Sequence, residues 1–218
     1  MQPGPDLIKA CPNCGKRHTF FTLLSGNTFN GIVYSDTKSV YPHNPQHPPF
    51  YQCSSCDALF ETQDAIDVES LNQNDADTSD WEQYPKFKTL GPDEFLLLKD
   101  RYSEGINKLP ELAKLFCVFC HHAFNDRTRA GNPIFVRPED EANYRAIVFQ
   151  LIHLLDNESE NDLILIGELY RNIGEFDNAI KCLNKITSPH MQRISKQILS
   201  AAQKGERQVF RLDLDEPD

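Results

Sequence analysis

Two pairs of cysteines lie within the first 56 residues, Cys11-Pro-Asn-Cys14 and Cys53-Ser-Ser-Cys56. The two-residue gap lets both sulfur atoms of one tight turn reach a single ion, and Gly15 can adopt the positive φ that turns backbone amides toward the sulfurs. Four thiolates complete the tetrahedral shell of a structural zinc site and leave no coordination position open. The sequence therefore predicts one structural zinc ion bound by Cys11, Cys14, Cys53 and Cys56.

The same cysteines have three other interpretations. The alternatives are reduced thiols without a shared ligand, a redox pair, and a metal site in which His18, His43 or His47 replaces one cysteine. A thioredoxin-type pair is disfavoured because the first pair does not follow a strand and open a helix. The four cysteines already complete a shell without a histidine.

The segment between the two pairs predicts short strands and turns. Apolar and aromatic residues recur there, and Asn30-Gly31 and Ser25-Gly26-Asn27 are turn signals. The stretch 41–50 holds four prolines and is expected to be an irregular loop. The strand candidates are Phe20, Phe21, Phe29, Ile32, Val33, Tyr34 and Val40.

The net charge of −10 is unevenly distributed: residues 1–56 carry +2, residues 57–100 carry −9 and the remainder carries −3. An acidic middle repels phosphate backbones, which disfavours general nucleic-acid binding. Residues 71–80 have almost no apolar content and are expected to be an exposed linker. Trp81, Tyr84 and Phe87 are expected to anchor the chain onto the next domain.

From Gly91 onward the pattern is helical, with proline and acidic residues at several helix starts. We expect four consecutive regions, namely a zinc-ribbon-like module (1–62), an acidic connector (63–90), a helical domain (91–205) and an acidic tail (206–218). The expected helices cover about 92–106, 110–125, 138–155, 161–172, 175–186 and 189–204.

Cys117-Val-Phe-Cys120-His121 matches the sequence motif of a c-type haem attachment site. Its neighbours are spaced for burial on a helix, so these cysteines are expected to be small core residues. His122 and Asp126 are four residues apart and, with His121, form a candidate trio for an unrecognised enzyme site.

A stretch of the helical region resembles one tetratricopeptide repeat. Gly167 and Ala179 are small where two antiparallel helices would touch, Tyr170 fills the space above them, and Gly174 ends the first helix. Leu163 stands where the repeat usually has tryptophan and Leu183 where it has phenylalanine. The resemblance implies protein or peptide binding on a concave face.

The whole chain looks like a group of uncharacterised bacterial proteins that join a Cys-x-x-Cys zinc module to a tetratricopeptide-like region. The segments that carry this resemblance are Ser25–Phe29, Ser35-Asp36-Thr37-Lys38, Cys53–Phe60 and Gly167–Ala179. It supports the architecture and adds little about activity.

These observations predict an α+β protein with a β-rich zinc module followed by a helical bundle. The function they favour is a non-catalytic adaptor or scaffold that binds a protein or peptide. The alternatives are nucleic-acid binding, with Phe20, Phe21, Tyr34 and Tyr41 stacking on bases, and an enzyme with an unrecognised site. No apolar run approaches the roughly 20 residues of a membrane span, so we expect a cytoplasmic protein without membrane association.

Overall fold

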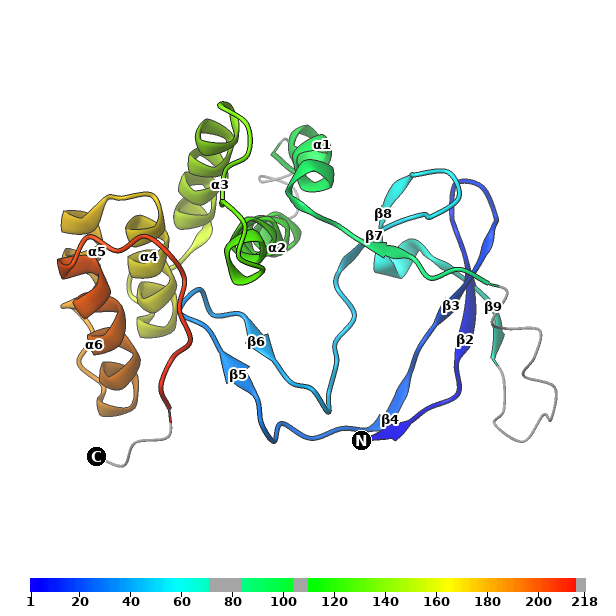
Figure 1. Ribbon diagram of the computed structural model, residues 1–218, viewed down its shortest axis with the longest axis horizontal. Coiled ribbons are helices and arrows are strands. Elements are labelled where there is room, and N and C mark those ends of the chain that lie inside the picture. The colour runs from blue at the N-terminus through cyan, green and yellow to red at the C-terminus, as the bar shows by residue number, and fades with distance from the viewer. Residues whose placement is uncertain (71–83, 104–109, 215–218) are drawn as a thin grey trace. The chain divides into compact units, whose positions relative to one another are not determined.

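The computed structural model describes residues 1–70, 84–103 and 110–214, and the chain forms two compact units. The first consists of Met1–Gly31 and Val40–Glu94, and the second of Ile32–Ser39 and Phe95–Asp218. The units are therefore interleaved along the chain, whereas the expected regions were consecutive. Each unit is described separately below (Figure 1).

The first unit is built from short, mostly antiparallel strands that form three small sheets, in the orders β3-β2-β9, β10-β7-β8 and β1-β4. A 3-10 turn (Thr62–Asp64) follows β8. The strands are β1 (Gln2–Pro3), β2 (Leu7–Ala10), β3 (Arg17–Phe20), β4 (Leu23–Ser25), β7 (Phe50–Gln52), β8 (Leu59–Glu61), β9 (Ile66–Ser70) and β10 (Lys88–Thr89).

Strand β2 shows why this segment forms an inner strand. Ile8 and Ala10 alternate with less buried neighbours, as expected for a strand with one face on the core. The strand pairs with β3 on one side and with β9 on the other.

The expected irregular loop is confirmed, since no strand or helix occurs between Tyr41 and Pro49.

The structure differs from the expected connector at 63–90. Residues 66–70 pair with β2 as β9, and β10 pairs with β7, so both ends of this segment belong to the first unit. Phe87 is buried in the core of that unit, against Cys11, Tyr51 and Phe60, because its ring completes an aromatic cluster. Trp81 and the expected linker 71–80 lie outside the described residues.

The second unit contains the helices, and the α+β class is confirmed. No helix in the described part of the chain combines the length and apolar character that crossing a membrane requires. The helices are α1 (Pro92–Ser103), α2 (Pro110–Arg129), α3 (Asp140–Leu154), α4 (Glu160–Asn172), α5 (Phe176–Leu183) and α6 (Pro189–Gln203).

Helices α4, α5 and α6 pack side by side, and the C-terminal segment crosses them (Figure 1). Gly167 on α4 lies directly against Leu183 at the end of α5. Gly174 ends the turn between the two helices at φ +82°, a conformation that glycine adopts without strain. The core of this part combines six buried residues, Leu163, Ile164, Leu183, Ile186, Ile198 and Leu212.

The hairpin of β5 (Ile32–Val33) and β6 (Ser39–Val40) brings a loop into the helical unit. The amide of Leu212 donates to the carbonyl of Val33, and the amide of Ser35 donates to the carbonyl of Phe210, at 2.8 and 2.9 Å. Residues 206–212, expected to belong to an acidic tail, are therefore ordered by pairing with this hairpin, and Leu212 is buried.

We predict that Gly167→Ala destabilises the helical unit. The new Cβ would lie 2.6 Å from Cγ of Leu183. Overpacking of this kind costs about 1–3 kcal/mol, which exceeds the gain of up to about 1 kcal/mol from replacing a helical glycine. Urea unfolding of the full chain, followed by far-UV circular dichroism, measures the difference.

The matched control is the same substitution in a Leu183→Ala background, where the opposing side chain no longer fills the space. There, Gly167→Ala should be neutral or stabilising. A stabilising effect in the parent chain would contradict the packing.

Candidate functional site

The four cysteines of the two pairs converge in the first unit. Their sulfur atoms all lie within 4.8 Å of one another, and the cysteines are free thiols. Sγ of Cys11 lies 3.8 Å from Sγ of Cys56, and Sγ of Cys14 lies 3.8 Å from Sγ of Cys53. Among the described residues this is the only cluster of three or more His, Cys, Asp or Glu side chains that could hold a metal ion.

Each cysteine pair sits in the turn of a β-hairpin, and the two turns repeat the same hydrogen bonds. The amides of Gly15 and Asp57 donate to the carbonyls of Cys11 and Cys53, at 2.9 and 3.0 Å. Gly15 and Asp57 both have positive φ, +69° and +57°. The hairpins β2–β3 and β7–β8 therefore present two equivalent sulfur-bearing turns.

Backbone and side-chain amides point at the sulfurs. The amides of Asn13 and Ser55 donate to Sγ of Cys11 and Cys53, at 3.4 and 3.3 Å. The amide of Ala58 and the side-chain amide of Asn13 lower the pKa of the Cys56 thiol to about 6. These donors favour thiolate, which is the form that binds metal ions. At Cys14 the Lys16 amide lowers the pKa, but burial and the other three cysteines outweigh it and raise the pKa to about 12.

The arrangement fits a tetrahedral metal ion. With metal–sulfur distances of about 2.3 Å, neighbouring sulfurs in a tetrahedron lie about 3.8 Å apart, which is the distance in the Cys11–Cys56 and Cys14–Cys53 pairs. Cys11 and Cys53 are buried and Cys14 and Cys56 are exposed. An ion held by all four would have no open coordination position.

The histidines considered as alternative ligands have other contacts. His18 is buried, stacks on Phe87 with ring centroids 4.1 Å apart, and hydrogen-bonds the carbonyl of Lys16 and the hydroxyl of Ser54. His47 bonds the carbonyl of Phe21 and the hydroxyl of Tyr51. Nε2 of His18 also lies 3.7 Å from Sγ of Cys53, within hydrogen-bonding distance of the sulfur. His43 is exposed. The candidate ligand group nevertheless consists of the four cysteines and includes none of these histidines.

The aromatic residues considered for base stacking are divided between the two units. Phe20 is stacked on His47 at a centroid distance of 3.7 Å. Phe21 is 38% exposed and Tyr41 is half-buried. Tyr34 belongs to the helical unit, where the guanidinium of Arg129 covers its ring. Phe20 and Tyr34 are therefore each already stacked against another side chain of their own unit.

Asp36 is the centre of a buried polar network in the second unit. Its carboxylate accepts hydrogen bonds from Asn125, at 3.1 Å, and from Arg129, and its backbone carbonyl accepts one from Nε2 of His122 at 3.0 Å. Burial raises the pKa of Asp36, but His121, His122 and Arg129 outweigh this effect, so the pKa lies below its ordinary value.

The three residues considered as an enzyme site, His121, His122 and Asp126, each have different hydrogen-bond or ion-pair partners in and around this network. Nε2 of His121 accepts from Asn125, so its Nδ1–H donates to the hydroxyl oxygen of Tyr144 at 2.9 Å. Asp126 instead pairs with Lys38 and Arg129. Sequence reasoning missed Asp36, although the loop it lies in was noticed as part of a resemblance.

The haem-like motif is buried within α2. Burial raises the pKa of Cys117 to about 12 and raises that of Cys120 well above its ordinary value. Both residues are fully buried. These thiols are therefore protonated core residues, in agreement with the interpretation of this segment as a core helix.

A second buried network holds the C-terminal segment on the helices. The buried pair Glu168 and Arg171 on α4 bonds the hydroxyl of Ser35, and Arg171 donates to the carbonyls of Glu206 and Gln208. Asn172 donates to the carbonyl of Arg207 at 2.8 Å. Main-chain groups of the segment are thus recognised by side chains of α4.

The same mode of recognition continues on α6. The side-chain amide of Gln197 both donates to the carbonyl of Asp213 and accepts from its amide, at 2.8 and 2.9 Å. This pair of bonds resembles one rung of a β-sheet. Helices α4 and α6 together therefore bind an extended segment through its backbone.

No family model, curated protein or solved structure matches the chain.

We predict that the helical unit loses stability as the pH falls below about 6.5, partly through His121. Burial lowers the pKa of His121 to about 3, whereas in the unfolded chain a histidine titrates near 6.5. Between these values the unfolded state binds one more proton, so this contribution to the free energy of unfolding is complete above pH 6.5 and declines by roughly 1.4 kcal/mol for each pH unit below it.

Urea unfolding, followed by far-UV circular dichroism between about pH 6.5 and pH 4.5, gives the slope of stability against pH. His121→Gln should reduce this slope by about that amount, because glutamine does not titrate. His190→Gln, at an exposed position of α6, is the matched control and should leave the slope unchanged. Equal slopes in all three proteins would contradict the buried neutral state of His121.

Proposed function

We propose that the chain is a non-catalytic adaptor. In this proposal the first unit is organised by one zinc ion on Cys11, Cys14, Cys53 and Cys56. The second unit binds a protein or peptide partner.

The zinc assignment rests on the geometry and chemistry of the four thiols. Four soft sulfur ligands at tetrahedral spacing suit zinc, which has no redox chemistry of its own. A closed shell favours a structural role over a catalytic one. When bound, the ion would join the turns of two hairpins that are far apart in the sequence.

The binding role rests on one observation, namely the way the helical unit holds its own C-terminal segment. Arg171, Asn172 and Gln197 bond to main-chain atoms between Glu206 and Asp213. Recognition of this kind depends little on the sequence of the bound segment, because every residue offers a backbone carbonyl. A helical surface with such groups suits an extended peptide.

The helical hairpin also supports a tetratricopeptide-like interpretation of this region. Gly167 packs against Leu183, and Ala179 is fully buried at the helix contact. The second helix of the hairpin, α5, is short, with 8 residues. One such hairpin followed by α6 suits a compact binding surface better than a long solenoid, which needs several stacked units.

The zinc proposal predicts about one zinc ion per purified chain. Cys11→Ser and Cys56→Ser should lose the ion and the folded state of the first unit, because metal-binding energy is folding energy at such sites. Elemental analysis and near-UV circular dichroism measure both effects. Cys182→Ser, on α5, is the matched control and should retain the zinc; a metal-free parent protein would refute the proposal.

The substitution Gly15→Ala strains the first cysteine turn without removing a zinc ligand. Alanine at Gly15 meets no atom within 4 Å but must keep φ at +69°, which costs about 1–2 kcal/mol. Gly15→Ala should therefore weaken zinc affinity by about 5- to 30-fold in competition with a chelator. Gly131 has φ +78° and equally open space, so Gly131→Ala in the second unit should leave zinc affinity unchanged.

The binding role predicts a protein partner that survives nuclease treatment. Cross-linking in native cells, followed by purification of the full chain with and without nuclease, should recover the same protein in both samples. Recovery of nucleic acid, with every protein lost after nuclease, would favour the nucleic-acid alternative instead. The heat-unfolded chain is the control for non-specific capture.

A further inference from the structure

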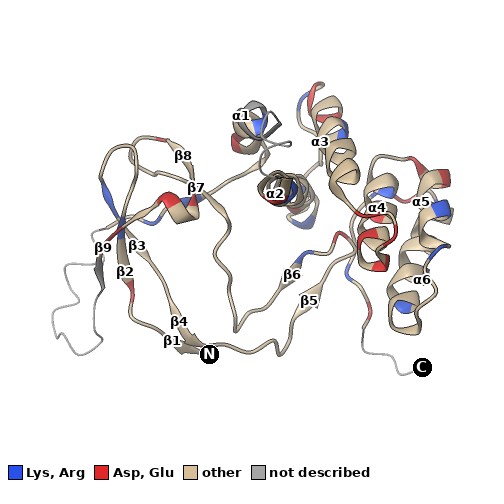
Figure 2. Ribbon diagram, turned by 180° about the vertical axis from the view of Figure 1, so that it is seen from behind, with Lys and Arg blue, Asp and Glu red and all other residues tan. Residues whose placement is uncertain are grey.

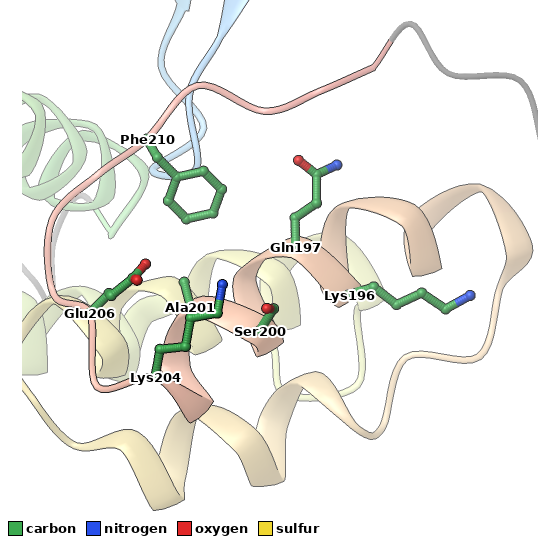
Figure 3. Close-up of a pocket in the computed structure, with 7 residues that line it drawn as sticks. All are labelled: Lys196, Gln197, Ser200, Ala201, Lys204, Glu206 and Phe210. Atoms are coloured by element: carbon green, nitrogen blue, oxygen red, sulfur yellow. The ribbon is translucent and has the colours of Figure 1, made fainter.

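A hollow of about 520 Å³ lies between α6 and the C-terminal segment. Figure 3 shows Phe210 reaching from the C-terminal segment toward the helix, with Ser200 and Ala201 on the helix below it. The remaining lining residues are Lys196, Gln197, Lys204 and Glu206. The hollow thus has charged ends and a centre lined by Phe210, Ala201 and the small side chain of Ser200.

The two lysines define the length of this hollow. Lys196 on α6 and Lys204, the residue that directly follows the helix, lie at its opposite ends (Figure 3), with Ser200 of α6 midway between them. Eight residues of α-helix span about 12 Å. Both lysines are exposed, and neither forms an ion pair within the described part of the chain.

Helix α6 is unusual in a chain of net charge −10 because it carries basic residues and no acidic ones. Figure 2 shows Lys and Arg along α6 without Asp or Glu. Arg193 on the same helix is already paired, at 3.8 Å, with Asp213 of the C-terminal segment. One acidic side chain of an extended segment, Asp213, is therefore already paired with this helix.

The spacing of the lysines matches an extended peptide. Residues i and i+4 of a strand lie about 13 Å apart and point to the same side, and residue i+2 points to that side between them. Acidic side chains at i and i+4 would reach Lys196 and Lys204, while an apolar side chain at i+2 would enter the hollow against Ala201 and Phe210.

We propose that this hollow binds an extended acidic peptide of a partner protein, with the pattern acidic-x-apolar-x-acidic. The proposal rests on the peptide-binding role proposed above and names the chemistry of the ligand. Glu206 lies at the same end of the hollow as Lys204 (Figure 3) and weakens binding by repelling the acidic residue there.

A single-stranded nucleic acid would also bring negative charge, but it fits the hollow less well. Its continuous phosphates would meet the overall charge of −10. A peptide needs only two charges at the two lysines and places an apolar group between them. The experiment therefore includes a nucleic acid as a competing probe.

The test measures fluorescence anisotropy of a labelled nine-residue peptide with two aspartates four positions apart and leucine midway, added to the zinc-loaded full chain at low salt. Lys196→Gln and Lys204→Gln should each weaken binding by about two- to fivefold, the range for exposed charge pairs. Glu206→Gln should strengthen it by a similar factor. Lys185→Gln, an exposed lysine outside the hollow, should have no effect.

The peptide itself provides further controls. Replacing both aspartates with asparagine, placing them adjacent, or changing the leucine to serine should each reduce affinity. Ser200→Phe, which fills the centre of the hollow, should abolish binding while the far-UV spectrum stays unchanged.

Three results would overturn the proposal: no binding of the peptide, binding that is insensitive to both lysine substitutions, or tighter binding of oligouridylate that is lost with the same substitutions. A nuclease-resistant partner together with no peptide binding would reject this hollow and leave the adaptor role intact. Loss of the partner as well would reject both.

Discussion

Sulfur atoms from two hairpin turns meet in the first unit, and the arrangement of its strands depends on that meeting. Its strands have only two to five residues, and such short pairs contribute little stability by themselves. One core cluster of the unit consists of Cys11, Cys53 and Ala65 with the rings of Tyr51, Phe60 and Phe87 around them. A bound ion would join the two hairpins directly, so the metal site and the fold of this unit are one feature.

The helical unit depends on a different constraint, namely that its buried charged side chains need hydrogen-bond and ion-pair partners. Asp36, Glu168 and Arg171 are fully buried, and removal of one partner from such a group typically costs about 3–5 kcal/mol. Their partners come from the inserted hairpin, from α2 and α4, and from the C-terminal segment. These networks explain why residues 32–39 and 206–212 belong to the helical unit despite their distance in sequence.

The same networks shape the surface that we assign to binding. Arg171 and Gln197 hold the C-terminal segment along the helices, and this segment supplies Phe210 as one wall of the hollow. Lys196 of α6 and Lys204, which follows this helix, remain exposed beside it. The proposed peptide site is therefore a consequence of how residues 206–213 are held on the helices, and not of the helical hairpin alone.

The sequence by itself determined the helices of the described residues and the irregular proline loop, because each depends on residues that are close together in the chain. It also determined the four-cysteine cluster, because two Cys-x-x-Cys pairs in one small region are the ligand set of a single metal ion even though the pairs are far apart. The two-residue gap between Cys11 and Cys14 defines a turn, and apolar residues that recur about every 3.6 positions define one face of a helix. Only the tertiary structure decided that Asp36 and Ser35 enter the helical unit, that Phe87 packs beside the cysteines, and that Lys196 and Lys204 border a hollow. These features arise from packing between segments distant in sequence, which no local pattern encodes.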